Sequence, residues 1–565
     1  MPFTSPTRDH RFILDHVVDF ASVAKTERYS EATPDLVDAI LGEAGKLCDE
    51  VLAPVNRAGD EHPSVLENGV VRTPPGFDTA YRAIADGGWI GLMADPKHGG
   101  MGLPLSLATS INDMMSGACL SLQLNPMLTQ GQIEALEAHA SDAIKSLYLP
   151  KLISGEWSGT MNLTEPQAGS DVGALKSRAE PNGDGTYAIT GQKIFITWGD
   201  AEFMANICHL VLARLPDAAP GTKGISLFLV PKFLPTADGS PGKRNQLHTV
   251  SLEHKMGIHG SPTAVMEYDG ATGWMIGAEN GGMAAMFTMM NNARLGVGSQ
   301  GIGVAEAAFQ AALGYARDRR QGKVGGTGTI VEHADVRRML TAMKADIFAA
   351  RAIALACAVA IDLSKAGDSP EWTARAALLT PVAKAFGTDT GIRVADMGIQ
   401  VHGGMGFIEE TGAAQFLRDV RITAIYEGTN GIQAMDLVGR KMMDGGEALY
   451  RLLDDVEDGA ETARTDLPGL AEKVWGAAET LREVTEWLVD QSLEDRFAVA
   501  VPYLCALARV LGGHFHLKAA LADPARKPLA QFYVGRLLPE HLGMLAQVRE
   551  GASGLYDLTP DDLGA

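Results

Sequence analysis

The periodicity of the apolar residues changes twice along the chain, and these changes limit the fold more than any other feature. Over residues 34–157 apolar side chains recur at spacings of three and four, which is typical of helices. From Ser158 the period shifts towards two, in short segments rich in β-branched and aromatic residues such as KIFIT, HLVLAR and ISLFLV. This pattern ends near Gly273, and the helical period returns from Gly281. The sequence therefore predicts a β region between two helical regions.

Four segments follow from this pattern: an N-terminal helical domain (1–157), a central antiparallel β domain (158–275), a helical bundle (276–445) and an additional helical C-terminal domain (446–565). The fold class is α+β and mostly α. In the β domain a turn is expected at Gly191-Gln192. The last segment contains VPYLCALARVLGGHFHLKAAL, which is too apolar to remain in water, so we expect it to pack against the rest of the chain.

Charge and composition exclude several classes of protein. The formal net charge is −21, from 48 Lys+Arg and 69 Asp+Glu, which argues against nucleic acid as a partner and against a polybasic membrane anchor. The five cysteines include no CxxC pair and no zinc-ligand spacing, so we expect a reducing compartment and no metal site. The N-terminus lacks the apolar core of a signal peptide, and the purest apolar run, Ala352 to Ile361, is too short to span a bilayer. These features predict a cytoplasmic protein that needs no membrane.

Four glycines interrupt the long apolar helical run: Gly296, Gly298, Gly301 and Gly303. Each glycine destabilises a helix interior by about 1 kcal/mol relative to alanine, so we expect something to pack very close to this backbone. Tight packing against another helix is the favoured explanation. A dinucleotide fingerprint is rejected, because the spacing is GxxGxG and the run lies within a helix rather than between a strand and a helix.

The segment MNLTEPQAGSDVGAL, residues 161–175, carries polar residues that a hydrophobic core would not require. It leaves a predicted strand at Thr164 and turns at Gly169 and Ser170. Such a turn exposes backbone N–H groups and hydroxyls, which suit a polar ligand. An ordinary capped turn is the alternative.

A second polar segment is IQVHGGMGFIEETG, residues 399–412. Its three glycines within four residues permit close approach of the backbone to a flat or anionic group. A simple loop between helices is the alternative.

The third segment, residues 418–441, contains Glu427 after an apolar run and directly before Gly428 and Thr429. Thr429 or Asn430 is the predicted N-cap of the helix that follows. The helix dipole should lower the pKa of Glu427 and burial should raise it, and we expect burial to win because a catalytic base needs a pKa near the working pH. The alternative is a carboxylate that merely caps the helix.

These three segments, together with GQKIFIT and RDRRQGK in the same order, resemble the acyl-CoA dehydrogenase family from about residue 40 to residue 443. The resemblance implies a helical domain, a β domain and a helical bundle, with FAD as cofactor and an acyl-CoA as substrate. It also implies electron-transfer flavoprotein as the electron acceptor and a homodimer or homotetramer.

The resemblance also implies roles for particular residues. Glu427 would be the base, Thr197 would lie near the N5 edge of the flavin, Arg294 would hold the CoA moiety, and Arg319 would reach the FAD pyrophosphate of a neighbouring subunit. The implied cofactor-binding residues are Met161, Leu163, Thr164, Gly169, Ser170, Phe195, Thr197, Arg319, Gln400, Gly403, Gly404 and Thr429. The implied substrate-binding residues are Ser170, Asn291, Arg294, Tyr426 and Gly428. Two departures from the family pattern are Phe195, where tryptophan is frequent, and the segment from Arg319 to Gly322, which is one residue shorter.

The residues suit the chemistry that this family performs. Desaturating a thioester between Cα and Cβ needs a base for the α-proton and an acceptor for the β-hydride. No side chain accepts hydride, so the flavin must supply that step.

The choice of substrate is narrowed by the ends of the chain. The extension 446–565, the MPFTSPTRDHRFIL opening and the RRQGK variant resemble the subfamily that includes 3-methylmercaptopropionyl-CoA dehydrogenases. We therefore expect a short acyl group such as 3-methylthiopropionyl or butyryl. Met286, Met289 and Met290 could adapt to a thioether guest, or simply fill the core. The alternatives are a medium- or long-chain acyl-CoA dehydrogenase, an acyl-CoA oxidase and a non-catalytic scaffold.

Overall fold

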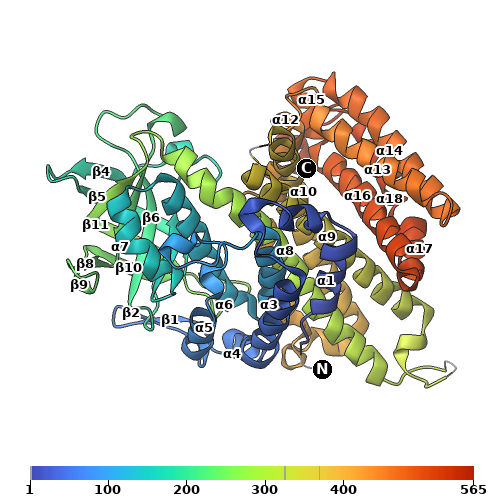
Figure 1. Cartoon of the computed structure of the whole chain (residues 1–565), viewed down its shortest axis with the longest axis horizontal. Helices are drawn as coiled ribbons and strands as arrows, with labels where there is room; N and C mark the ends of the chain where they lie inside the picture. The colour runs from blue at the N-terminus through green and yellow to red at the C-terminus, as the bar shows by residue number, and fades with distance from the viewer. Residues whose placement is uncertain (1–2, 324–325, 368, 565) are drawn as a thin grey trace. The chain divides into compact units, whose positions relative to one another are not determined.

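The computed structural model describes residues 3–323, 326–367 and 369–564, and the side chain of Asn291 lies outside what it describes (Figure 1). The chain forms two compact units. The helical unit is Met1–Gly45, Pro104–Gly117 and Arg294–Ala565, and the sheet unit is Lys46–Leu103 and Ala118–Ala293. The four domains predicted from the sequence remain a prediction, because the two units group the chain in a different way.

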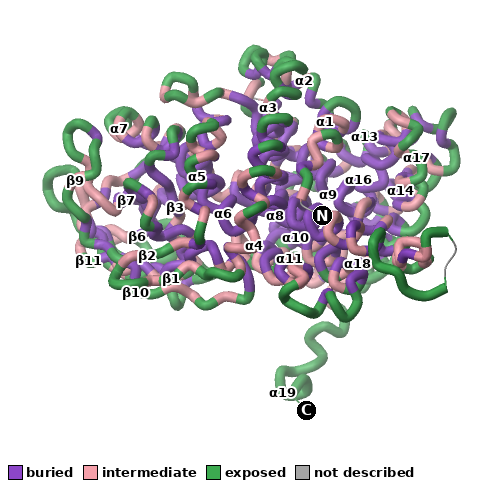
Figure 2. Tube along the Cα trace, turned by 90° about the horizontal axis from the view of Figure 1, so that it is seen from below, coloured by how far each residue is buried: buried purple, intermediate pink, exposed green. Residues whose placement is uncertain are grey.

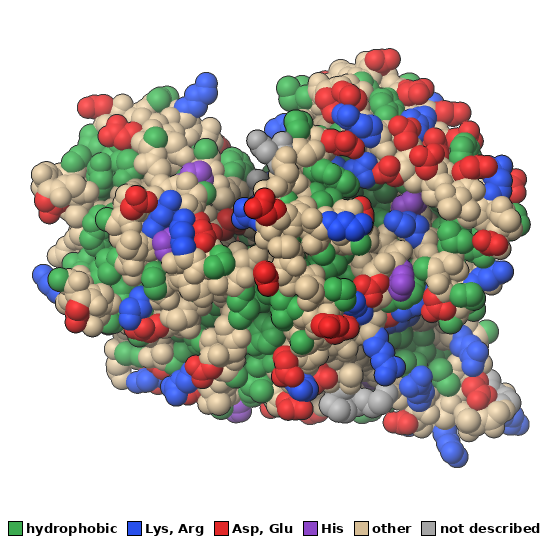
Figure 3. Space-filling view, in the orientation of Figure 1, with side chains coloured by type: hydrophobic (Ala, Val, Ile, Leu, Met, Phe, Trp, Pro, Cys, Tyr) green, Lys and Arg blue, Asp and Glu red, His purple; other side chains and the backbone are tan. Residues whose placement is uncertain are grey.

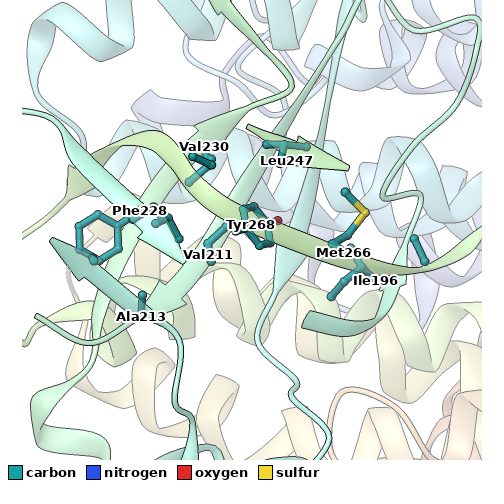
Figure 4. Packing of buried hydrophobic residues seen from close by; sticks show 12 residues of the cluster. Ile196, Val211, Ala213, Phe228, Val230, Leu247, Met266 and Tyr268 are labelled. Atoms are coloured by element: carbon teal, nitrogen blue, oxygen red, sulfur yellow. The ribbon is translucent and has the colours of Figure 1, made fainter. Parts of the chain in front are cut away.

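Within the described residues of the sheet unit, seven strands form one sheet in the order β3-β6-β7-β11-β5-β4, with β10 paired to β11. Their bounds are β3 (Trp157–Asn162), β4 (Arg178–Pro181), β5 (Tyr187–Thr197), β6 (Asn206–Ala213), β7 (Ser226–Pro231), β10 (Leu247–Leu252) and β11 (Thr263–Ile276). Two small hairpins complete the strands: β1 (Val65–Glu67) with β2 (Val70–Arg72), and β8 (Phe233–Pro235) with β9 (Pro241–Arg244). One face of the sheet holds a tightly packed apolar cluster that includes Val211, Phe228, Met266 and Tyr268 (Figure 4).

Two details of the sheet differ from the sequence prediction. The turn expected at Gly191-Gln192 is wrong, because β5 continues through it. Gly191 has φ +144°, and a Cβ there would lie 2.5 Å from Ser177 Oγ, so the glycine permits close approach of a neighbouring segment rather than a turn. The sheet is also not purely antiparallel, since β3 and β6 pair in parallel. Parallel neighbours need a crossover connection, and the chain between these two strands supplies one through β4 and β5.

Helices make up most of the described chain outside the strands. Those before the bundle are α1 (Thr7–His16), α2 (Phe20–Ala24), α3 (Pro34–Leu47), α4 (Ala53–Glu61), α5 (Phe77–Asp86), α6 (Leu105–His139) and α7 (Asp142–Ile153). The bundle contains α8 (Gly282–Asp318), α9 (Ala334–Gly367), α10 (Pro370–His402), α11 (Ala413–Val420) and α12 (Asn430–Gly439). Short 3-10 segments lie at η8 (Gly403–Phe407) and η10 (Arg421–Ala424).

The glycines of α8 allow this helix to pack very closely against α10. A Cβ at Gly298 would lie 2.6 Å from the carbonyl oxygen of Ala383, and one at Gly301 would lie 2.5 Å from that of Gly387. Any side chain at these positions would collide with the α10 backbone. The helix–helix packing predicted from these glycines is therefore confirmed.

The C-terminal segment packs against the bundle, as its apolar content predicted. It comprises α13 (Glu447–Ala463), α14 (Pro468–Val489), α15 (Leu493–Ala498), α16 (Ala500–Ala522), α17 (Lys527–Phe532), α18 (Glu540–Val548) and α19 (Pro560–Gly564). The apolar helix α16 contacts α9, α10 and α12. The fully buried Arg509 of α16 donates to Asp346 of α9 and pairs with Glu540 at 2.6 Å. Acidic side chains gather on the outer surface over α13 and α14 (Figure 3).

Helix α9 is long and apolar enough to cross a membrane, judged by length and composition alone. Over an 18-residue window its mean hydropathy is 1.9, so the apolar character of α9 extends beyond the ten-residue run recognised in the sequence. However, 83% of that window is buried inside the protein, as the purple colour of α9 in Figure 2 shows. In the described structure α9 is thus a core helix of the helical unit.

Candidate active site

Glu427 lies in a strained turn between η10 and α12. Its φ is +54°, a left-handed conformation that residues with a side chain rarely adopt, and Gly428 follows with φ +85°. Thr429 then caps α12, because its side chain accepts a hydrogen bond from the N–H of Ile432 at 3.3 Å. The N-cap prediction is thus settled in favour of Thr429. Non-glycine residues in such conformations concentrate at functional sites.

The local environment of Glu427 raises the pKa of its carboxyl group. Burial raises its pKa to about 7, and the positive charges of Arg294 and Lys384 oppose that shift without cancelling it. Burial therefore wins, as expected from the sequence. Beside it, Tyr426 donates its hydroxyl to Gln300 Oε1, and burial raises the pKa of Tyr426, so this phenol stays neutral.

Gln433 holds the Glu427 turn from the following helix. This fully buried amide donates from Nε2 to the carbonyl oxygen of Glu427 at 3.2 Å and to that of Gly428 at 3.5 Å. A Cβ at Gly428 would lie only 2.8 Å from the same Nε2, which explains why glycine occupies that position. The sequence reasoning missed Gln433, although a glutamine inside the apolar run GIQAM is a usable signal.

Arg294 is a buried cation whose charge acts on Glu427. Its NH1 lies 3.8 Å from Asp436 Oδ2, and its buried Nε finds no hydrogen-bond partner among the described residues. Burial lowers the pKa of Arg294, and the charges of Asp436 and Glu427 act in the opposite direction. The predicted contact of Arg294 with CoA is not tested by these distances and remains a prediction.

Lys384 and Asn430 form part of the same site and were missed in the sequence. The fully buried Lys384 donates from Nζ to Asn430 Oδ1 at 2.9 Å, and Asn430 donates from Nδ2 to Asp389 Oδ1 at 2.7 Å. A lysine within the apolar run PVAKAFG was the signal that could have revealed this cluster.

Four other predicted residues of the helical unit lie on its surface. Gln400 is exposed near the end of α10, and Gly403 and Gly404 follow at η8. A Cβ built on either glycine would have no described atom within 4 Å. Arg319 is exposed directly after α8, and its N–H donates to the carbonyl oxygen of Tyr315 at 2.9 Å. The structure thus groups Glu427 with Tyr426, Gly428, Thr429 and Arg294, and places Gln400, Gly403, Gly404 and Arg319 at exposed positions. The side chain of Asn291 lies outside the described part.

In the sheet unit, a buried ion pair anchors the loop that follows β3. Glu165 accepts from Lys193 Nζ at 2.8 Å, from the Lys176 N–H at 2.6 Å and from the Ser177 hydroxyl at 2.6 Å. Lys193 also donates to the carbonyl oxygen of Leu163 at 3.0 Å. The predicted flavin-binding residues around this ion pair are accessible. Met161, Leu163 and Thr164 are half-buried, and Gly169 and Ser170 are exposed.

Phe195 and Thr197 lie at the end of β5. Phe195 has φ +60° and is 58% exposed, so its ring faces outward where the family frequently has tryptophan. Thr197 is half-buried, and its carbonyl oxygen accepts from Thr160 Oγ1 at 2.7 Å, which joins β5 to β3. The following Trp198 is buried and donates from Nε1 to the carbonyl oxygen of Ser121 at 3.1 Å.

These residues fit FAD. The sheet unit offers the hydroxyls of Thr164, Ser170 and Thr197 and the exposed ring of Phe195, and no described atom lies within 4 Å of a Cβ built on Gly169. Such a glycine allows close approach of the backbone to a ligand.

Comparisons with known proteins agree with this arrangement. Family models match nearly the whole chain, as acyl-CoA dehydrogenase N-terminal domain (37–156), middle domain (160–271) and C-terminal domain (280–443), followed by acetyl-CoA dehydrogenase C-terminal like (452–559). A 3-methylmercaptopropionyl-CoA dehydrogenase of Ruegeria pomeroyi is 49% identical over 463 residues, which cover 80% of this chain and 79% of the relative. A butyryl-CoA dehydrogenase of Syntrophomonas wolfei is 36% identical over 570 residues, covering 94% and 92%.

The fold is also that of a solved acyl-CoA dehydrogenase from Bacillus anthracis complexed with FAD. The two chains are 20% identical and align with a TM-score of 0.75 over 97% of this chain and 92% of the other. The chain belongs to the acyl-CoA dehydrogenase family, and it is an FAD-dependent oxidoreductase that acts on acyl-CoA.

Proposed function

We propose that this enzyme desaturates a short acyl-CoA, with 3-methylthiopropionyl-CoA and butyryl-CoA as the candidate substrates, and that Glu427 is its base. The observation that carries the role of Glu427 is its strained, half-buried turn with a pKa of about 7. A base with that pKa is substantially ionised at neutral pH and still strong enough to take a proton. The names of the two relatives support a short acyl group.

In this mechanism an Oε of Glu427 takes the proton from Cα of the acyl group, and the electrons of the broken bond form the new Cα–Cβ double bond as a hydride leaves Cβ. FAD, held by the residues assigned below, would supply the acceptor for that hydride. Gln433 keeps the turn in place through the carbonyl oxygen of Glu427.

We assign the predicted binding residues in the same terms. Thr164, Gly169, Ser170, Phe195 and Thr197 of the sheet unit would hold the flavin, together with Met161 and Leu163. Thr429, Gln400, Gly403, Gly404 and Arg319 of the helical unit would complete the FAD contacts. Ser170, Asn291, Arg294, Tyr426 and Gly428 would contact the acyl-CoA.

The test is anaerobic reduction of the purified flavoprotein by a panel of acyl-CoA thioesters. Reduction is measured as the loss of visible flavin absorbance. We expect the short thioesters to reduce the flavin fastest. Absence of reduction by every acyl-CoA in the panel would contradict the proposal.

The proposal also includes an oligomeric state, an electron acceptor and a location in the cell. The segment after Gly404 exposes three apolar side chains, with Met405 at 46%, Phe407 at 86% and Ile408 at 44%. Apolar side chains gathered on an exposed segment favour burial against another protein surface, which supports a homodimer or homotetramer. Electron-transfer flavoprotein as the acceptor and a cytoplasmic location follow from the family resemblance and the sequence composition.

A further inference from the structure

Lys384 occupies an unusual position for a lysine. It is fully buried in α10, where α8 approaches so closely that a Cβ on Gly298 would lie 3.3 Å from the Lys384 Cα. A lysine is almost never fully buried unless its charge is paired. The close packing of the two helices fixes the backbone from which the ammonium group extends.

The ammonium group is directed to the first residue of α12. Nζ donates to Asn430 Oδ1 at 2.9 Å, and the amide nitrogen of Asn430 donates in turn to Asp389 Oδ1 at 2.7 Å and to Thr388 Oγ1 at 3.0 Å. Residues of α10 therefore bind both the oxygen and the nitrogen of the Asn430 amide. Because Glu427 lies three residues before Asn430, these contacts also restrain the turn that carries the base.

Charges around Lys384 and Glu427 act on each other. Burial lowers the pKa of Lys384 to about 8, while Asp389 and Glu427 raise it and Arg294 lowers it. In return the positive charge of Lys384 lowers the pKa of Glu427, as that of Arg294 does more strongly. Further charged groups act on this cluster: Asp436 and Arg440 act on Arg294, Arg393 and Arg421 act on Asp389, and Glu427 acts on Tyr426.

We propose that Lys384 is a positioning residue for the base: it holds the start of α12 through Asn430, and its charge stabilises the carboxylate form of Glu427. This inference rests on the proposed role of Glu427 as the base. Lys384 does not react in this scheme, and it acts on the acyl-CoA only through the carboxylate that it stabilises.

The test replaces Lys384 with a side chain of similar length and no charge, Lys384→Met, and measures kcat/KM against pH. Loss of a nearby positive charge should raise the pKa of the carboxyl by ~1 unit, so the acid limb of the profile moves to higher pH. At pH 7 this shift corresponds to a loss of about fivefold in kcat/KM. Lys384→Arg, which keeps the charge and can still donate to Asn430, should bring the limb back towards its original position.

A second readout does not depend on turnover. Infrared difference titration follows the protonated carboxyl band that Glu427→Gln removes, and this band should titrate at higher pH in Lys384→Met. The matched control is Lys344→Met, which removes a lysine of α9 that pairs with Asp9 at 2.7 Å and should leave both titrations unchanged.

The outcomes separate the inference from the proposed function. If Lys384→Met lowers kcat/KM equally at every pH and leaves the carboxyl titration unmoved, the electrostatic role is wrong. If the band of Glu427 moves but Glu427→Gln still allows flavin reduction, the link between the residues stands and the assignment of the base fails.

Discussion

The side-chain amide of Gln433 donates a hydrogen bond to the backbone carbonyl of Glu427 over 3.2 Å. Gln433 therefore holds Glu427 through its backbone carbonyl, and this contact does not use the Glu427 carboxylate. The amide comes from the second turn of α12, so the helix that follows the base also fixes its backbone.

Replacing Gln433 with leucine should test this restraint. The change leaves the Glu427 carbonyl without its donor, which should destabilise the fold by about 1–3 kcal/mol. We also expect kcat to fall ~10-fold or more with FAD retained, because small displacements of a catalytic group slow the reaction steeply. Gln310→Leu is the control, since it removes an amide that donates to the Thr4 carbonyl at 2.7 Å and should leave kcat intact. Equal kcat in both variants would refute the positioning role of Gln433.

Glu427→Gln should retain FAD and lose reduction by acyl-CoA, because the amide preserves the shape and removes the base. General-base catalysis contributes about 10²–10⁴-fold, so single-turnover reduction should slow by at least that range. Loss of FAD together with activity would instead mean that Glu427 is structural. Reduction at an undiminished rate would remove Glu427 from the mechanism.

The unmodified enzyme should show a pH dependence that follows from the same carboxyl. Burial raises the pKa of Glu427 to about 7 against an ordinary value of 4.5, so the active carboxylate is depleted as pH falls below 7. We expect kcat/KM to fall about tenfold per pH unit well below that value and to level off above it. An acid limb centred near 4.5 would contradict the burial argument.

How much of this site was predictable differs from residue to residue. Glu427, Gly428 and Thr429 stand together in sequence, and local rules predicted a buried carboxylate beside a helix whose cap is Thr429 or Asn430. The role of Glu427 as the base came from the family resemblance. Lys384 and Asn430 act through contacts that depend on how α10 and α12 pack, whereas the contact of Gln433 with Glu427 spans only six positions. Lys384 and Asn430 are 46 positions apart, and no local pattern specifies that pairing.

The fold shows the same limit. The helical and β regions followed from periodicity, and the glycines of α8 predicted close helix packing. The parallel pairing of β3 with β6 did not follow, because strand order depends on long-range contacts. Gly191 was misread as a turn, since a glycine that admits a neighbouring side chain looks identical in sequence to one that turns the chain.

Lys193→Met should destabilise the loop that carries the predicted flavin-binding residues. It leaves the buried Glu165 carboxylate without its cation, and breaking a buried pair in this way costs about 3–5 kcal/mol. We expect a lower Tm and loss of FAD on dilution. Adding Glu165→Gln should recover part of the stability, because the uncompensated charge is then removed. A Lys193→Met protein with normal Tm and FAD content would contradict the anchoring role.

The stabilisation that the Glu165–Lys193 pair gives to the fold should be lost in acid. Burial acts to raise the pKa of Glu165, but Lys193, the Ser177 hydroxyl and the Lys176 N–H outweigh it and hold the pKa at about 2, below the ordinary 4.5. A lowered carboxyl pKa stabilises the fold above pH 4.5, and this stabilisation is lost as pH falls from 4.5 towards 2. The stability difference between the parent and the double variant should therefore shrink across that window.

Arg319→Ala tests the oligomer. Arg319 is exposed directly after α8, and the family resemblance sends this arginine to the FAD of a neighbouring subunit. We expect weaker FAD retention, measured by filtration, in a protein that is at least a dimer by light scattering. Arg317→Ala, an equally exposed arginine in the last turn of α8, is the matched control. A monomer that holds FAD tightly would overturn the prediction.

The substrate is expected to carry a short acyl group, as the names of the two relatives suggest. Met286 and Met289 are buried in the sheet unit, where a Cβ on Gly131 would lie 2.9 Å from the Met289 Cγ, so Met289 fills the core there. This packing favours the core interpretation of Met289. Of the three methionines, the half-buried Met290 is the one most accessible to a ligand.

The enzyme should discriminate only modestly between acyl groups of neighbouring chain lengths, because one methylene is worth about 1–3 kcal/mol. Long chains should be rejected more firmly, because overpacking adds its own penalty. The measurement is kcat/KM from propionyl-CoA to palmitoyl-CoA with 3-methylthiopropionyl-CoA included, and a win of about tenfold or more, worth ~1.4 kcal/mol, for acyl groups of octanoyl length or longer would refute the short-chain proposal while leaving Glu427 and FAD in place.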